Sequence, residues 1–478
     1  MKKNFLIKIA MVAAMSLFFA GVIIFESCHN TSKDDDGKLQ SAIIIPKNFP
    51  AGINFPVDSA TILGWLSQYD TTDITKHAWE IWRGLTASSG EQYGSDTLLI
   101  YETWFGPREL AYFCTLKDVK EAALQQKKGR TELKIPHQFA HAGMLRGQVV
   151  DTQKGFNIFE SVAYNIPASV YAVRNKIFNK SVLQGYYGAN GGTDIPPFPN
   201  NSITTKPTYY AGKADKNGKI RVPVWPGSPS PAKNFPVDSF GAYVYADITN
   251  SQPVNKVPVP ITQSNPSDSA IKAATVNVND FIHYKIDAAM AAYLNEVDID
   301  PVSAGDFKKG DMVLLVAMHV GTKEISNWTW QTFFWTPNPA QPLFPSSAFA
   351  ANLKPTNLNG AANHYAVATA YAMVWPNQPV NGGTNTGATP IIAFNPYLEA
   401  GLGNLSSNLP NHLNPNYQWG VQTNCMSCHA QATVVPSNPG KSLPYTADQY
   451  ISMNDTMFYK FLKLDFAWSI QGNVNAKN

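Results

Sequence analysis

The stretch Met312-Val313-Leu314-Leu315-Val316 is a continuous run of apolar residues that begins just after Gly310. A short apolar run bounded by turn-forming residues is typical of a buried β-strand. The same kind of pattern predicts further short strands at Thr97 to Tyr101, Lys219 to Val224 and Ile391 to Phe394. The dipeptide Asn217-Gly218, just before the second of these, is typical of a two-residue hairpin turn.

Helical patterns are fewer and shorter than the strand and loop signals. Apolar residues at helical spacing predict helices at Thr75 to Leu85, Leu116 to Gln126, Pro167 to Asn179 and Ala447 to Leu462. Long loops rich in Pro, Asn and Gly separate these segments. We therefore expect an α+β fold, with a β-rich body that carries short helices.

The residues that point to a chemistry lie near the C-terminus, where Cys425-Met426-Ser427-Cys428-His429 has the spacing C-x-x-C-H. This is the attachment sequence of a c-type haem. In that role Cys425 and Cys428 form thioether bonds to the porphyrin, and His429 coordinates the iron from the proximal side. The alternatives are a chance pair of cysteines, a zinc half-site and a redox dithiol. Since no second ligand pair follows at short spacing and the motif lies between loops, we predict one covalent haem c.

The start of the chain indicates where such a haem could be attached, because covalent attachment takes place outside the cytoplasm. Met1-Lys2-Lys3 precedes an apolar stretch from Ile9 to Phe25, the pattern of a secretion signal. Cys28, directly after Ser27, resembles the lipidated cysteine of a bacterial lipoprotein. The alternative is an uncleaved anchor, because about 17 apolar residues is near the minimum for a spanning helix. Both interpretations place the body in the periplasm or cell envelope, next to a membrane, and leave exposure at the cell surface open.

Four regions follow from these signals. We expect a lipoprotein-type signal peptide at 1–27, a flexible tether at 28–45, a mixed α/β body of unknown function at 46–395 and a haem c-binding region at 396–478. Only 49 residues follow His429. A chain that short cannot enclose a porphyrin alone, so the haem-binding region is expected to be packed on the body or inserted into it.

Charge and cysteine content narrow the possible partners. Without the three lysines and the glutamate of the leader, the chain has 34 basic and 33 acidic residues, a net charge of +1. A nearly neutral chain lacks the basic surface of a nucleic-acid-binding protein. Once lipid and haem account for Cys28, Cys425 and Cys428, only Cys114 remains, and its apolar neighbours predict an inert buried thiol.

The sixth ligand of the iron is open at this stage. Met453 and Met457 are the nearest candidates, and their i, i+4 spacing places both on one face of the expected helix. Packing in the core is the alternative for both. Competing candidates are single histidines in apolar surroundings, each of which fits a structural role as well: His77, His319 and His364. His137 and His141 have the spacing of a metal pair but lack a third ligand nearby, so a solvated helix start is preferred there.

Several blocks resemble a group of largely uncharacterised bacterial c-type cytochrome proteins. His319-Val320-Gly321-Thr322-Lys323 and Trp328-Thr329-Trp330-Gln331-Thr332-Phe333 are similar to its His-x-Gly-Lys and Trp-x-Trp-x-Thr-Phe signature, with Thr322 as an extra residue. The resemblance implies a secreted monohaem protein and no known substrate. Further similar blocks are His77-Ala78-Trp79, Gly84-Leu85-Thr86, Asn395-Pro396-Tyr397-Leu398-Glu399, Asn424 to Ala430 and Asp465-Phe466-Ala467-Trp468-Ser469.

The sequence therefore predicts an extracytoplasmic monohaem c-type cytochrome that transfers single electrons to or from a redox partner protein or a small molecule. One alternative is a haem-dependent redox enzyme of the peroxidase or oxidoreductase kind, with an open distal site under the large aromatic body. Another is a haem-containing sensor or binding lipoprotein. A strong sixth ligand favours electron transfer, whereas a weak or missing one favours the alternatives.

Overall fold

The computed structural model describes residues 44–93, 96–128, 158–189, 191–192, 194–229, 235–288, 291, 308–358, 360–401, 424–441, 443 and 449–474. Cys28, the leader and most of the tether lie outside these residues, as do His137 and His141. The chain from Ala42 to Asn478 forms one compact unit, which includes both the body and the C-terminal region.

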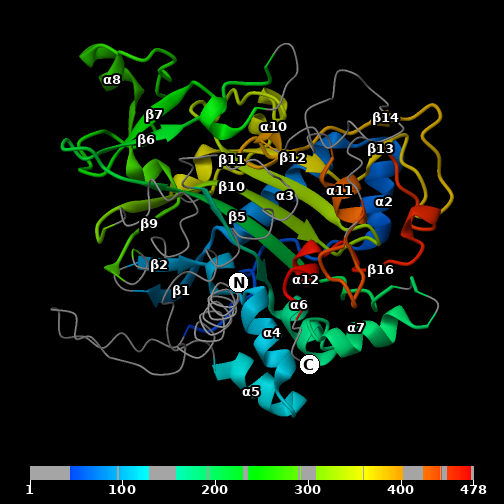
Figure 1. The fold of residues 1–478 in the computed structure, drawn as a ribbon. Coiled ribbons are helices and arrows are strands. Elements are labelled where there is room, and N and C mark those ends of the chain that lie inside the picture. Colours follow the sequence, from blue (N-terminus) through cyan, green and yellow to red (C-terminus); the bar gives the residue numbers. More distant parts are fainter. Residues whose placement is uncertain are drawn as a thin grey trace, which may run out of the picture. The chain divides into compact units, whose positions relative to one another are not determined.

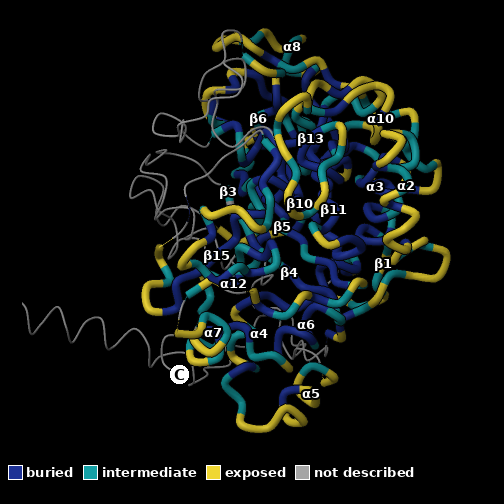
Figure 2. Tube along the Cα trace, turned by 90° about the vertical axis from the view of Figure 1, so that its right-hand side faces the viewer, coloured by how far each residue is buried: buried dark blue, intermediate teal, exposed yellow. Residues whose placement is uncertain are grey.

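Strand β10 (Met312–Thr322) is the centre of the fold. All eleven of its residues are buried, which matches the continuous apolar run from which the strand was predicted. It pairs antiparallel with β5 (Ile203–Gly212) on one side and with β11 (Thr329–Trp335) on the other. Figure 1 shows these three long strands side by side in the middle of the structure, and Figure 2 shows them in its buried interior.

These strands belong to a seven-stranded sheet with the order β12-β11-β10-β5-β3, in which β4 also pairs with β5 and β9 with β10. Every one of these pairings is antiparallel. The four shorter strands of the sheet are β3 (Ile158–Glu160), β4 (Ala163–Tyr164), β9 (His283–Lys285) and β12 (Tyr365–Ala370).

Helix α3 (Thr71–Leu85) packs its aromatic side against one face of this sheet. Asp70 caps its start by accepting a hydrogen bond from Asp73 N at 3.0 Å. Trp82 stacks on Phe333 of β11 with ring centroids 4.4 Å apart. Both tryptophans of the helix satisfy their indole N–H on backbone carbonyls, since Trp79 and Trp82 donate to Ala350 O and Ala362 O at 2.8 and 3.0 Å.

Smaller elements surround the sheet. Figure 1 shows α4 to α7 gathered at one end of the long strands, with β6, β7 and α8 at the other. The remaining strands are β1 (Ser88–Tyr93), β2 (Asp96–Leu99), β6 (Lys219–Pro223), β7 (Tyr243–Asp247), β8 (Thr275–Asn277), β13 (Val374–Trp375), β14 (Thr389–Pro390), β15 (Thr433–Val434) and β16 (Leu462–Lys463). The remaining helices are α2 (Ser59–Gln68), α4 (Pro107–Thr115), α5 (Val119–Lys128), α6 (Ile166–Arg174), α7 (Lys180–Tyr187), α8 (Asp268–Ala274), α10 (Ala348–Asn352), α11 (Cys425–Ala430) and α12 (Trp468–Gln471). The 3-10 helices are η1 (Tyr101–Thr103), η4 (Val237–Ser239), η5 (Val278–Asp280), η6 (Gly360–His364), η7 (Glu399–Gly401) and η10 (Thr456–Phe458).

The α+β class with a β-rich body is confirmed. The strands predicted at 97–101, 219–224 and 312–316 correspond to β2, β6 and β10, and the first three predicted helices correspond to α3, α5 and α6. The turn at Asn217-Gly218 is present, and Gly218 takes the left-handed φ of 71° that such turns need. The hairpin prediction was wrong, because β6 pairs with β7 rather than with β5.

Two other elements were predicted wrongly. Residues 391–394 form only an isolated bridge between Ala393 and Asn424, because they lie against the start of α11 instead of a sheet strand. The described part of the helix expected at 447–462 consists of turns, η10 and the start of β16. There, contacts across the fold replace helical hydrogen bonds. Ile451 N donates to Met373 Sδ at 3.2 Å, and Met453 N donates to Val380 O at 3.0 Å.

The partly buried side chain of Lys354 makes the stability of the protein depend on pH. Its ammonium donates to Asn363 O at 2.6 Å and to Tyr365 O at 2.9 Å, and burial lowers its pKa to about 8. Between that pH and the usual 10.5 the unfolded chain binds more protons, so the free energy of unfolding must rise with pH. We expect the free energy of unfolding of the wild type, relative to that of Lys354→Met, to rise by about 2–3 kcal/mol between pH 8 and 10.5. Urea unfolding of both proteins at each pH measures this difference. The titration of all other groups contributes equally to both proteins and cancels in this difference. A difference that does not change with pH would contradict the prediction.

Candidate functional site

The C-x-x-C-H motif forms helix α11, and Asn424 fixes the start of that helix. The Asn424 side chain accepts a hydrogen bond from Ser427 N at 2.9 Å, as a helix cap does. Its amide group donates to the backbone carbonyls of Ala372, Met373 and Ile391 at 3.0, 3.2 and 2.8 Å. One buried side chain therefore both starts the helix and anchors it to the body.

A cavity of about 570 Å³ opens beside α11. Its size is within the usual range for cofactor and ligand sites, roughly 300–1,000 Å³. Its walls come from segments distant in sequence, which include α11, the strands β3, β5, β10 and β11, η7 and the C-terminal stretch from Phe466 to Val474. The lining contains the three haem-binding residues of the motif together with ionisable and aromatic residues of the body and one glycine: Cys425, Cys428, His429, Glu160, Lys206, His319, Gly321, Trp330 and Glu399. A second cavity, of about 610 Å³, lies beside α6 and holds none of these residues.

His429 is held in one protonation state. Its Nδ1 lies 2.8 Å from Phe466 O, and because a carbonyl can only accept, Nδ1 carries the proton. Burial lowers the pKa of this imidazole to about 3, so the ring is neutral at ordinary pH. The lone pair is then on Nε2, which is the form of histidine that binds a metal.

The ring of Trp330 stacks on His429, with centroids 3.8 Å apart and an interplanar angle of 29°. Gly321, the β10 partner of Trp330, makes this position possible. A Cβ atom at Gly321 would lie 2.9 Å from the indole Cζ3 and 3.0 Å from Cη2. The absence of a side chain there lets the indole lie across the sheet and reach the imidazole.

Gly321→Ala is therefore expected to displace Trp330 and destabilise the protein by about 1–3 kcal/mol, the usual cost of overpacking. Denaturant unfolding measures the loss of stability. Quenching of tryptophan fluorescence reports whether the Trp330 ring has moved. Gly64→Ala in α2 is the matched control, because its Cβ would meet nothing within 4 Å. Equal stability of the two variants would show that Trp330 has room to move.

Both cysteines of α11 are free thiols that face the cavity. Burial raises the pKa of the Cys428 thiol to about 12, and the negative charge of Glu399 adds to this effect. Burial also raises the pKa of Cys425 well above its usual value. A redox dithiol needs the opposite shift, toward the thiolate, so the site does not suit thioredoxin-like exchange.

Two pairs of ionisable side chains share the cavity with these residues. His319 Nε2 lies 2.6 Å from Glu399 Oε1, and Lys206 Nζ lies 2.7 Å from Glu160 Oε2. Burial lowers the pKa of Lys206, but the Glu160 carboxylate outweighs it and the net shift is upward. His319 was named as a candidate from the sequence. Glu160 and Lys206 were missed, because single charged residues far from the motif carry no local signal.

Met453 and Met457 are not brought to this cavity. Met453 lies in a turn and Met457 in the 3-10 helix η10, and both are half-buried against a hydrophobic cluster that contains Phe458 and Leu462. Neither lines the cavity that holds His429. The α-helix that was expected to place both on one face is absent, and the contacts of both side chains fit the packing alternative.

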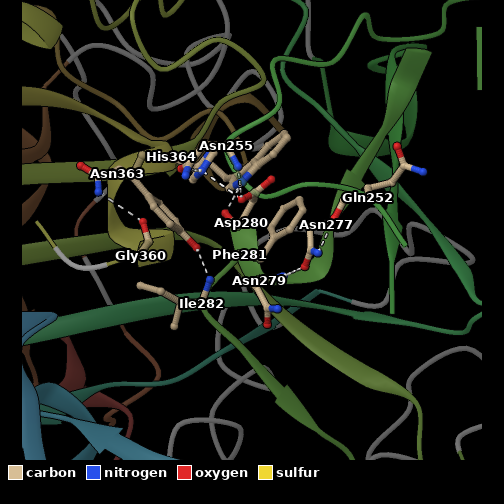
Figure 3. A network of polar contacts seen from close by, with 12 residues as sticks. Gln252, Asn255, Asn277, Asn279, Asp280, Phe281, Ile282, Gly360, Asn363 and His364 are labelled. Atoms are coloured by element: carbon tan, nitrogen blue, oxygen red, sulfur yellow. Dashed lines mark hydrogen bonds and ion pairs between the residues drawn. The ribbon is translucent and has the colours of Figure 1, made fainter. Parts of the chain in front are cut away.

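His77 and His364 lie in polar networks elsewhere in the core. His77 contacts Tyr371 OH at 2.7 Å and Glu324 Oε1 at 3.2 Å. His364 Nε2 lies 3.2 Å from Asp280 Oδ1 and 3.1 Å from Asn255 Oδ1, in the network shown in Figure 3. Neither histidine lines the cavity beside α11. Both fit the structural role that was the alternative for each.

Cys114 is buried, and its thiol lies 3.5 Å from Ala172 O. Burial raises its pKa to about 11, as expected for an inert thiol.

No family model, curated protein or solved structure matches the chain. Within the described residues, no group of three or more His, Cys, Asp or Glu side chains could hold a metal ion by itself. No described helix is long and apolar enough to cross a membrane. The function is therefore argued from the cavity beside α11, and the resemblance to c-type cytochromes stays a prediction.

Proposed function

We propose that this protein is an extracytoplasmic c-type cytochrome with one covalent haem, and that it transfers single electrons. The observation that carries the proposal is the placement of Cys425, Cys428 and His429, the three haem-binding residues of the motif, on the wall of one cavity of about 570 Å³. Both cysteines and the histidine thus border the same space. A chance C-x-x-C-H sequence has no reason to line a cavity of cofactor size.

The residues present suit the group. Cys425 and Cys428 would bind the porphyrin through their sulfur atoms, each thiol adding across one vinyl group. His429 would coordinate the iron through Nε2, because the Phe466 carbonyl already occupies Nδ1. Bound haem supplies a reversible one-electron carrier. The surrounding sheet and the stacked Trp330 keep the imidazole fixed and shielded, which limits reorganisation when the charge of the site changes.

The location belongs to the same proposal. The leader and Cys28 would direct the chain to the periplasm or cell envelope and anchor it to a membrane through lipid. There the partner would be a redox protein or a small electron donor or acceptor.

A haem-dependent redox enzyme is the second candidate function. The observation in its favour is the presence of two acid–base pairs, His319 with Glu399 and Lys206 with Glu160, on the wall of the same cavity. Such groups can move protons to a bound reactant, provided that the distal side of the iron is open.

The test is the absorption spectrum of the full chain after maturation in a periplasm that attaches haem c, with the pyridine haemochrome measured on the same sample. We expect one covalent haem per chain and a reduced spectrum that does not change under carbon monoxide. Rapid binding of carbon monoxide would favour the redox enzyme. No covalent haem would overturn both candidates.

A further inference from the structure

Three buried histidines of this protein each pair with a carboxylate: His77 with Glu324, His319 with Glu399 and His364 with Asp280. The three pairs are chemically alike, and all three imidazoles are at least nine-tenths buried. Only His319 also lines the cavity that holds His429. His319 therefore differs from His77 and His364 in its position at the cavity and not in the kind of residue with which it pairs.

The sheet register places His319 close to His429. His319 and Gly321 project from the same face of β10, and Trp330 opposite Gly321 shares that face. Residues two apart on a strand are separated by about 6.6 Å. Since the Trp330 ring lies over Gly321 and stacks on His429 at 3.8 Å, the face of β10 that carries His319 is the one turned toward His429, and both histidines line the same cavity.

The hydrogen bond to Glu399 selects the free nitrogen of His319. A carboxylate accepts hydrogen bonds, so the short contact of 2.6 Å places an N–H on Nε2, and in the neutral ring the lone pair is then on Nδ1. Glu399 is itself fixed, because its second oxygen accepts from Asn395 N at 2.5 Å. A carboxylate that holds the outer nitrogen of an imidazole is the usual support of a metal-bound histidine.

The other named candidates are less suitable. None of the described residues that line the cavity is a methionine, and Met453 and Met457 pack elsewhere. Lys206 also lines the cavity but is bound to Glu160 at 2.7 Å and stays charged.

We propose that His319 is the sixth ligand of the haem iron, oriented by Glu399, so that the iron has two histidine ligands. The inference rests on the proposed function, since it needs haem in the cavity. Two imidazole ligands close the distal side and favour electron transfer over binding of a small reactant. They also hold the potential lower than a methionine ligand would, and the Glu399 carboxylate lowers it further by strengthening His319 as a donor.

The experiment compares the haem-loaded full chain with His319→Ala, Glu399→Gln, the double variant Met453→Leu/Met457→Leu and His283→Ala. His283 is the matched control, because it lies on β9 and does not line the cavity. Low-temperature electron paramagnetic resonance and near-infrared magnetic circular dichroism identify the ligand pair in the ferric state. The pyridine haemochrome of each sample first establishes that covalent haem is present.

We expect a low-spin spectrum with two nitrogen ligands in the wild type, the methionine variant and His283→Ala. His319→Ala should become high-spin and bind carbon monoxide when reduced, and added imidazole should restore the low-spin spectrum. Glu399→Gln should stay low-spin with a raised potential. A methionine-ligated spectrum that the methionine variant loses would overturn the inference, and so would a wild type that already binds carbon monoxide. Absence of haem from every sample would instead refute the proposed function.

Discussion

Replacing Cys425 and Cys428 together with alanine is expected to abolish covalent attachment of haem while the chain still folds. The thiols are the only atoms of the motif that can form bonds to the porphyrin vinyl groups. Loss of the buried Cys425 thiol and the half-buried Cys428 thiol leaves small gaps that cost on the order of 1 kcal/mol each. The asparagine that anchors α11 is untouched by the change. Haem staining of a denaturing gel measures attachment directly, because only covalently bound haem stays with the chain.

Cys114→Ala is the matched control for this experiment. Its thiol is also buried and has a raised pKa, but it lies against Ala172 and outside the cavity. The control should retain full haem stain, and circular dichroism should show folded protein for both variants. Haem stain that survives loss of both motif cysteines would mean that the chain attaches haem elsewhere, and the proposal would then fail.

The motif could be found from the sequence, whereas its surroundings could not. C-x-x-C-H is a local pattern, so Cys425, Cys428 and His429 were identified by spacing alone. The residues opposite them, Lys206 and Glu399, reach the cavity only because β5 and η7 are placed there by the fold. Met453 and Met457 were named as sixth-ligand candidates because they lie near the motif in sequence and were expected on one α-helix, but the fold places neither on the wall of the cavity.

The same contrast applies to the secondary structure. β10 was predictable because its residues are buried on both faces, and a continuous apolar run is the direct consequence of that burial. Residues 391–394 and 449–462 also contain buried apolar side chains, but their backbones contact Asn424 at the start of α11 and Val380 instead of extending a sheet or a helix. The pattern of apolar residues in a sequence indicates which residues are buried. It does not indicate whether their backbone forms a strand, a helix or a loop.

Glu324 ties three separate segments together just after β10. Its Oε1 accepts from Val57 N at 2.7 Å and from His77 Nε2 at 3.2 Å. Its Oε2 accepts from Thr322 Oγ1 at 2.5 Å. The residue is only 2% exposed, so water cannot replace these bonds when the carboxylate is removed.

Glu324→Ala is therefore expected to lower the free energy of unfolding by about 3–5 kcal/mol, the usual cost of removing one partner from a buried pair. Val57 N and His77 Nε2 would then be buried without this acceptor. Glu91→Ala is the matched control, because Glu91 forms a pair with Lys47 whose lysine is 38% exposed. That control should cost less than about 1 kcal/mol. Urea unfolding of the three proteins measures both values, and similar losses in the two variants would show that the Glu324 network gives no stability beyond that of a surface ion pair.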